Sequence, residues 1–197
     1  MKYLLTLSSA IVALGAGSAY AEDAAPEATA APAVEAAADH APAAEAVPMA
    51  VAKIFNDKGE QIGSASFMQG TIGVMADIKV EGLPPGAHGM HIHALGSCDH
   101  EDHFKSAGGH VNPDGKMHGY LNAEGPEKGD LPNIVVGENG SAQVELFLPQ
   151  FNVSGEGTVL LDDDGSALMI HEAADDYVTQ PIGGSGARIA CGVIEAK

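Results

Sequence analysis

The stretch Gly89-Met90-His91-Ile92-His93 carries two histidines, two positions apart, in a run of β-prone residues. Successive side chains of a β-strand point to opposite faces, so residues i and i+2 share one face. Both imidazoles can therefore reach one ion from a rigid backbone. The stretch predicts a strand and the first half of a metal site.

Further strand patterns follow one another from residue 49 to the C-terminus, and no long helical period appears. Turn signals rich in Gly, Asp and Asn separate them, such as Glu138-Asn139-Gly140 and Asp162-Asp163-Asp164-Gly165. Short strands at this spacing predict an antiparallel β-sandwich or flattened barrel. The expected strands span residues 49–56, 61–68, 71–81, 88–95, 134–136, 141–148, 158–161, 166–171 and 188–194.

The N-terminal segment stands apart from the β pattern, so the 197 residues allow one full domain, expected at 49–197. Residues 1–21 combine a basic Lys2, a short apolar run and the small-residue end Ala19-Tyr20-Ala21. This combination is typical of a cleaved secretory signal peptide. A retained membrane anchor is the alternative.

Residues 22–48 consist almost entirely of Ala, Pro, Glu and Asp. Such a segment cannot bury enough apolar surface to offset the entropy lost on ordering, so it predicts a disordered tether. It holds six acidic residues and the signal peptide one Lys, which leaves about −13 of the net charge of −18 on residues 49–197. This charge argues against nucleic acid and anionic lipid as partners.

Two connections are longer and more polar than ordinary hairpins, namely residues 96–132 and 172–187. The first contains Gly108-Gly109-His110-Val111-Asn112-Pro113, where the glycines let the backbone turn tightly near an ion. Long loops in a compact domain are usually functional or disordered, and these two are the richest in polar chemistry. We interpret them as the walls of a site.

The histidine pair and the residues around it offer a set of candidate metal ligands. Imidazole nitrogen suits copper and zinc, and a carboxylate beside histidines suits zinc. On the residues alone, a zinc-only or a copper-only site stays open. The candidates are His91, His93, His110, His118, Asp130 and His171.

Cys98 and Cys191 are the only cysteines of the chain. A secreted destination favours a disulfide between them, which would tie the first long loop to the final strand. Two metal-ligating thiolates are the alternative.

Five motifs, in order along residues 49–197, resemble a copper/zinc superoxide dismutase of the bacterial secreted, periplasmic type. The resemblance implies a Greek-key, immunoglobulin-like β-sandwich, or flattened eight-stranded barrel, with two long functional loops. The motifs are Gly89-Met90-His91-Ile92-His93, Ser106-Ala107-Gly108-Gly109-His110-Val111-Asn112-Pro113, Gly129-Asp130-Leu131-Pro132-Asn133, Ile170-His171-Glu172-Ala173-Ala174-Asp175-Asp176 and Gly186-Ala187-Arg188-Ile189-Ala190-Cys191-Gly192-Val193-Ile194.

The same resemblance implies a role for each matching residue. His110 would bridge copper and zinc, and Asp175 would bond a ligand of each metal. Arg188 would attract and position the superoxide anion, and Cys98 and Cys191 would form the family's disulfide. The remaining copper ligands would be His91, His93 and His171, and the remaining zinc ligands His118 and Asp130.

The implied reaction is the dismutation of superoxide to dioxygen and hydrogen peroxide by alternate reduction and oxidation of copper. His110 would leave copper on reduction, take up a proton and deliver it in the second half of the cycle. Zinc would be the structural and tuning partner. We expect a monomer or a homodimer, with no membrane contact after cleavage of the signal peptide.

One position departs from the family's pattern. The family usually has a third zinc histidine three residues before the aspartate, and Glu127 stands there in this chain. Glutamate can ligate zinc at a length similar to that of histidine nitrogen. A substitute ligand from His100 or His103, or a weak zinc site, are the other interpretations. If the zinc site fails, a secreted, non-catalytic copper- and zinc-binding module is the alternative function.

Overall fold

The computed structural model describes residues 49–197, so the expected signal peptide (1–21) and tether (22–48) lie outside the described residues. Residues 49–197 contain nine β-strands, one short 3-10 helix (η1, Lys105–Ala107) and no α-helix, which confirms the expected all-β class. Within this range no helix has the length and apolar character needed to cross a membrane.

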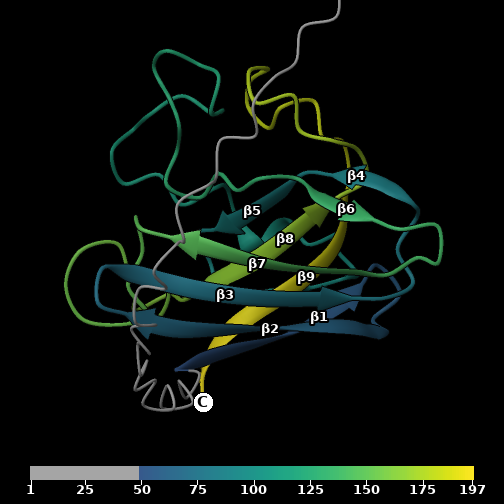
Figure 1. Ribbon diagram of the computed structural model, residues 1–197, viewed down its shortest axis with the longest axis horizontal. Coiled ribbons are helices and arrows are strands. Elements are labelled where there is room, and N and C mark those ends of the chain that lie inside the picture. The colour runs from purple at the N-terminus through teal and green to yellow at the C-terminus, as the bar shows by residue number, and fades with distance from the viewer. Residues whose placement is uncertain (1–48) are drawn as a thin grey trace, which may run out of the picture. The chain divides into compact units, whose positions relative to one another are not determined.

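Seven strands form one antiparallel sheet in the order β5-β8-β9-β1-β2-β3-β7, and the other two form a ribbon, β4-β6 (Figure 1). The last strand, β9, therefore pairs with the first, β1. The bounds are β1 Ala50–Asn56, β2 Gln61–Gly70, β3 Gly73–Val80, β4 Gly86–His88, β5 Met90–His93, β6 Ile134–Val136, β7 Ala142–Leu148, β8 Ser166–His171 and β9 Arg188–Ala196.

The sheet curls so that its two halves enclose one apolar core. Ile54 of β1, Phe67 of β2 and Ile78 of β3 are fully buried and pack in the same cluster as Ile92 of β5 and Leu168 of β8. Alternate residues of β1 and β3 face this core, as a strand with one solvated face requires. All residues of β5 and β8 are buried, so the two strands that carry histidines lie inside the domain.

Two expected strands differ in the structure. Residues 88–95 are divided at Gly89 between β4 and β5, because Gly89 bonds instead to Ala173 and His171. The expected strand at 158–161 is wrong. The backbone of that segment forms hydrogen bonds with residues 152–153, including one isolated β-bridge between Asn152 and Val159. Leu160 is therefore buried without belonging to a sheet.

The first long loop, between β5 and β6, closes the open edge of β5. The backbone N–H of Ile92 donates to the carbonyl of Gly129 (2.8 Å), and the N–H of Val111 donates to the carbonyl of Ile92 (2.9 Å). Isolated bridges join His91 to Asp130 and His93 to His110. An edge strand leaves unpaired backbone groups, and here two parts of one loop satisfy them.

Gly129 makes this close approach possible. A Cβ atom at this position would lie 2.3 Å from the carbonyl oxygen of Ile92, closer than side chains pack. The second long loop, 172–187 between β8 and β9, lies at the same end of the sheet as much of the first (Figure 1).

A disulfide joins Cys98 to Cys191 across 93 positions of sequence, which confirms the expected bridge. It fastens the first long loop to β9, and both sulfur atoms pack with a small second cluster around Phe104 and Met169. In the chain-entropy model, closing a loop of this length stabilises the fold by about 4 to 5 kcal/mol.

We expect the double substitution Cys98→Ser/Cys191→Ser to lower the free energy of unfolding by about 2 to 5 kcal/mol, because the unfolded chain regains the entropy that the bridge removes. Urea unfolding of the metal-free protein measures this. The reduced wild-type protein is the control and should unfold at the same urea concentration as the double variant. An unchanged midpoint in both would contradict the role of the bridge.

Candidate metal centre

Four histidines converge from two strands and a loop. His91 and His93 share one face of β5, His171 ends the neighbouring strand β8, and His110 comes from the loop segment that pairs with β5. One ring nitrogen of each lies within 4.8 Å of one nitrogen of every other, and the structure shows all four residues as a group able to hold a metal ion. We call His91, His93, His110 and His171 the four-histidine set.

Each ring of the four-histidine set has one occupied and one unoccupied nitrogen. His93 Nδ1 contacts the carbonyl of Gly108 (2.9 Å), and His171 Nδ1 contacts the carbonyl of Gly186 (3.1 Å). The opposite nitrogens are buried and have no hydrogen-bond partner within residues 49–197. These unpartnered atoms are His91 Nδ1, His93 Nε2, His110 Nε2 and His171 Nε2.

Burial keeps three of these imidazoles neutral. It lowers the pKa of His93 to about 2 and that of His171 to about 3, with further lowering from neighbouring histidines and Arg188. Burial also lowers the pKa of His91, although its bond to Asp175 opposes the shift. A neutral imidazole offers a free lone pair to a metal. Unpartnered, neutral nitrogens that converge fit a copper ion.

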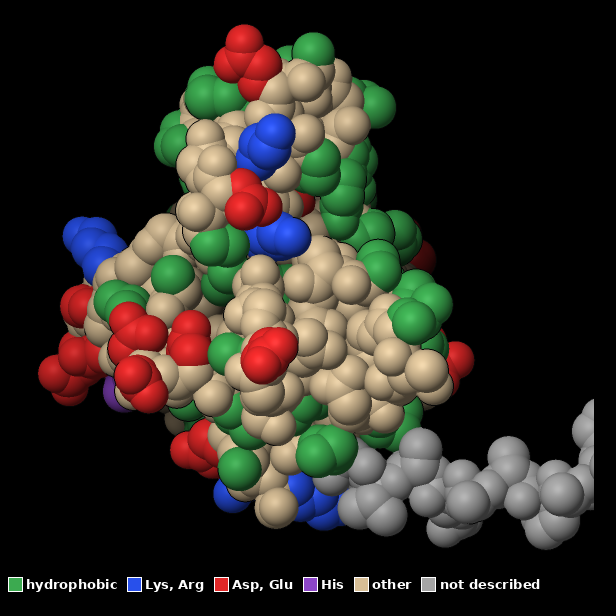
Figure 2. All heavy atoms as spheres, turned by 90° about the vertical axis from the view of Figure 1, so that its left-hand side faces the viewer, with side chains coloured by type: hydrophobic (Ala, Val, Ile, Leu, Met, Phe, Trp, Pro, Cys, Tyr) green, Lys and Arg blue, Asp and Glu red, His purple; other side chains and the backbone are tan. Residues whose placement is uncertain are grey.

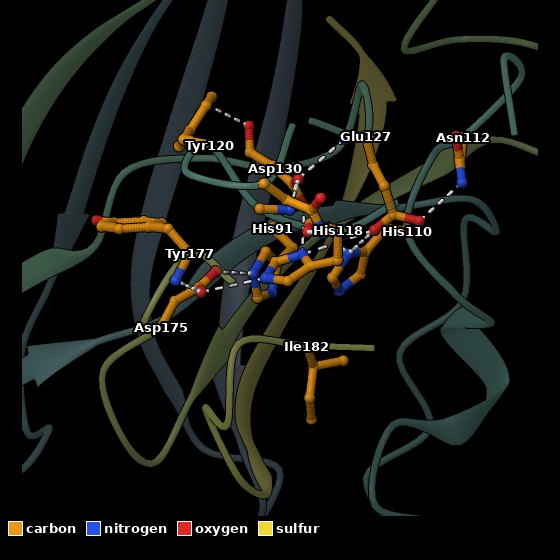
Figure 3. Close-up of polar contacts among 12 residues, drawn as sticks. His91, His110, Asn112, His118, Tyr120, Glu127, Asp130, Asp175, Tyr177 and Ile182 are labelled. Atoms are coloured by element: carbon orange, nitrogen blue, oxygen red, sulfur yellow. Dashed lines mark hydrogen bonds and ion pairs between the residues drawn. The ribbon is translucent and has the colours of Figure 1, made fainter. Parts of the chain in front are cut away.

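A second group shares His110 with the first. His118 Nδ1 lies 2.7 Å from Asp130 Oδ1, and His110 Nδ1 lies 3.4 Å from the same oxygen (Figure 3). We call His110, His118 and Asp130 the mixed set. Their nitrogen and carboxylate donors suit zinc, and His91 is the fourth residue within 4.8 Å.

Carboxylates dominate the electrostatics of the mixed set. Burial alone would lower the pKa of His118, but Asp130, Asp175 and Glu127 together raise it to about 11. For Asp130, burial acts to raise the pKa, and the bonds from His110 and His118 hold it well below its usual range. In the metal-free protein this group therefore holds protons that a bound ion would displace.

Asp175 connects the two sets. Its Oδ2 accepts from His91 Nε2 at 2.9 Å and its Oδ1 from His118 Nε2 at 3.1 Å, and its side chain is fully buried. These bonds hold its pKa far below the usual value although burial opposes this. Such a carboxylate fixes the orientation of both rings, and so decides which of their nitrogens face inward.

Several polar residues hold Asp175 and His118 in place. Asn133 exchanges two hydrogen bonds with the Asp175 backbone, at 2.9 Å each. Gln180 does the same for His118, accepting from its N–H (3.0 Å) and donating to its carbonyl (2.8 Å). Asn133 belongs to a motif noted in the sequence, whereas nothing in the sequence pointed to Gln180.

Gly183 lets the second loop approach this connection. It has a φ of +63°, and a Cβ atom there would lie 1.7 Å from Asp175 Oδ1. Any larger residue would displace the carboxylate that joins the two sets.

Arg188 borders the four-histidine set at the start of β9. Its guanidinium donates to the carbonyls of Phe104 (2.5 Å) and Gly108 (2.6 Å), and Gly108 is also the partner of His93. The side chain is partly exposed, so donors beyond these two bonds can meet an anion from solvent. Arg188 and His93 are thus held next to each other by the same carbonyl, that of Gly108.

The remaining described histidines take no part in either group. His88 contacts two backbone carbonyls, those of His171 and Pro84, as expected of a structural histidine. His100 and His103, the substitute zinc ligands considered in the sequence, are exposed and belong to neither group.

Two adjoining histidine-rich sets that share one ring, on a curled antiparallel sheet, define a protein with a two-metal site. The sequence profile of the family described as copper/zinc superoxide dismutase matches residues 61–194. The chain belongs to the copper/zinc superoxide dismutase family.

Individual relatives agree. The chain is 46% identical over 146 residues to superoxide dismutase [Cu-Zn] 1 of Aquifex aeolicus, covering 73% of this chain and 86% of the relative. It is 43% identical over 140 residues to the Caulobacter vibrioides enzyme, covering 70% and 80%. The family resemblance noted in the sequence is therefore confirmed.

Solved structures give the same answer for the fold. A double mutant of a SOD-like protein from Bacillus subtilis has a TM-score of 0.70 and 43% identity, covering 72% of this chain and 94% of that one. The Cu/Zn superoxide dismutase from Brucella abortus has a TM-score of 0.58 and 30% identity, covering 74% and 98%.

We expect Asp175→Asn to weaken binding of both copper and zinc by about 10- to 100-fold, because an amide cannot accept from His91 and His118 at once. Chelator competition for each metal measures this. Asp176→Asn is the matched control. Asp176 is the next residue along the chain, and its exposed carboxylate carries the same charge but contacts neither histidine ring. A loss confined to one metal would show that the carboxylate does not connect the sets.

Proposed function

We propose that His91, His93, His110 and His171 hold the copper of this superoxide dismutase, and that His110, His118 and Asp130 hold its zinc. The observation that supports this best is the set of four buried nitrogens that converge without partners. Superoxide is the substrate of the family.

When bound, copper supplies one-electron chemistry to two superoxide ions in turn, and zinc supplies a fixed positive charge, so that two superoxide ions and two protons give dioxygen and hydrogen peroxide. The protein must therefore deliver protons and attract an anion. Both tasks fall to named residues of the site.

His110 is the residue that we propose as the proton carrier. Its Nδ1 lies against Glu127 (2.7 Å) and Asp130 (3.4 Å), which raise its pKa against the effect of burial. Its Nε2 faces the four-histidine set without a partner. A ring whose Nδ1 is held by zinc would keep Nε2 available to take up a proton and pass it to reduced superoxide.

Arg188 is the residue that we propose to bind and orient the anion. A guanidinium is always charged and presents several donors. Residues 49–197 carry a net charge of about −13, and the second loop, 172–187, contains no Lys or Arg. Figure 2 shows both acidic and basic side chains on one face of the domain, with the acidic ones at many places. Attraction of superoxide therefore depends on cations close to the metal.

We also propose that residues 1–21 direct the chain to the periplasm and that the folded domain, 49–197, acts there after a tether at 22–48. The disulfide supports an oxidising compartment, since such bridges persist outside the cytosol. Every residue proposed for the metal site lies in this chain, and we propose that it acts as a monomer or a homodimer. Neither nucleic acid nor membrane is expected as a partner of this acidic domain.

We expect the purified protein to dismute superoxide catalytically after loading with copper and zinc, and not after loading with zinc alone, because zinc has no redox chemistry. Competition with a superoxide-reducible dye, with a chelator present to remove free copper, measures this. Tight copper binding without activity above buffer would favour a non-catalytic metal-binding module.

We expect Arg188→Ala to lower kcat/KM by about 10-fold or more and to weaken its dependence on ionic strength, because a local positive charge that attracts the anion is lost. Copper content should not change. Arg188→Lys is the control and should recover part of the rate, since it keeps the charge without the planar donors. If Arg188→Ala retains full kcat/KM and its salt dependence, another group binds the anion.

A further inference from the structure

We infer that Glu127 Oε2 is the fourth zinc ligand, so that the zinc site of this chain consists of two histidines and two carboxylates. The inference rests on the proposed zinc site of His110, His118 and Asp130. It assigns a role to the residue that stands where the family resemblance implies a third histidine.

The distances around Glu127 lie on either side of those that a tetrahedral ion requires. Zinc bonds of 2.0 to 2.1 Å to nitrogen and oxygen place the ligand atoms of a tetrahedron about 3.3 Å apart. Glu127 Oε2 lies 2.7 Å from His110 Nδ1 and 3.6 Å from His118 Nδ1. Asp130 Oδ1 lies 3.4 Å and 2.7 Å from the same two nitrogens. The two carboxylate oxygens thus flank the same pair of nitrogens in the same way.

In both carboxylates, hydrogen bonds to one oxygen fix the direction of the other. Glu127 Oε1 accepts from Asn112 Nδ2 at 2.8 Å, which leaves Oε2 toward the histidines (Figure 3). Asp130 Oδ2 accepts from the backbone N–H groups of Gly119 (2.8 Å) and Glu127 (2.9 Å), which leaves Oδ1 inward. In each residue one oxygen is anchored and the other faces His110 and His118. Glu127 is therefore held for one-oxygen ligation.

His91 does not complete the zinc site, although it lies within 4.8 Å of the other members. Its Nε2 bonds to Asp175, and its Nδ1 is one of the unpartnered nitrogens of the four-histidine set. His100 and His103 are exposed and form no ion pair or hydrogen bond with the mixed set, whereas Glu127 contacts both of its histidines. Among the described residues, this leaves Glu127 as the donor that completes the tetrahedron.

Glu127, in place of the histidine that the family resemblance implies, changes the charge of the zinc site and its exposure to solvent. Two carboxylates balance the charge of Zn²⁺, whereas three neutral histidines and one aspartate leave one positive charge. The Glu127 side chain is 14% exposed, while those of His118 and Asp130 are 1% exposed. Glu127 also lines a surface cavity of about 490 Å³ with Pro126 and Lys128. The Glu127 side is therefore the more exposed side of the proposed zinc site.

The test compares Glu127→Gln, Glu127→His and the matched control Glu124→Gln in the full mature protein. Glu124 is an exposed acid of the same loop whose side chain contacts neither set. Zinc affinity is measured by chelator competition, and the ligand set by the visible spectrum of Co²⁺ bound in place of zinc. Copper content and the unfolding temperature of the metal-free protein show whether each variant is folded.

We expect Glu127→Gln to weaken zinc binding by about 10-fold or more and to change the Co²⁺ spectrum, while copper content stays the same. Glu127→His should keep tight zinc binding with a spectrum of three nitrogen donors. Glu124→Gln should match the wild-type protein in every measurement.

Two results would overturn the inference in different ways. If wild-type protein binds zinc and Glu127→Gln binds it equally well with an unchanged Co²⁺ spectrum, Glu127 is not a ligand and the proposed zinc site stands without it. If His118→Ala also leaves zinc binding unchanged, the proposed zinc site itself is wrong. If Glu127→Gln does not fold, the folded Glu127→His variant takes its place. Wild-type zinc affinity with a Co²⁺ spectrum of three nitrogen donors then supports the inference, and an unchanged spectrum overturns it.

Discussion

Buried imidazole nitrogens without hydrogen-bond partners are the constraint on which the rest of this structure depends. An unsatisfied buried polar atom costs about 1 to 3 kcal/mol, and four of them face one another here. The other nitrogen of each ring bonds to a carbonyl or a carboxylate, and this bond fixes the direction in which the unpartnered nitrogen points. A metal ion bound by all four would satisfy them together.

The open edge of β5 is what gathers the ligands. A strand buried on both faces but unpaired on one side would leave backbone groups unsatisfied in the interior. The first long loop supplies their partners with residues near Val111 and Gly129. Because each of these is next to a ligand, the same backbone bonds bring His110 and Asp130 beside His91 and His93. The hydrogen bonds that stabilise the edge of β5 are therefore the same ones that assemble the site.

Charge is divided unequally across the site. The mixed set is rich in carboxylates, which raise the pKa of His118 to about 11, whereas burial lowers the pKa values of His93 and His171 in the four-histidine set. Arg188 lies next to the four-histidine set, within an acidic domain. The carboxylates can hold a divalent ion and favour a proton on His110, while the opposite side stays suited to an anion. One shared ring separates these two environments.

The amino-acid sequence alone determined the all-β class, the disulfide partners and the candidate ligands, because alternation, cysteine number and the spacing of His91 and His93 are local properties. It did not predict that 158–161 stays outside the sheets, since that depends on bonds to residues 152–153. The tertiary structure decided which donors meet, because Gln180 of the second loop bonds to His118 of the first, and Glu127 meets His110 across 17 positions of the first loop. Such contacts follow from the path of two loops around one strand edge, and no local pattern encodes that path.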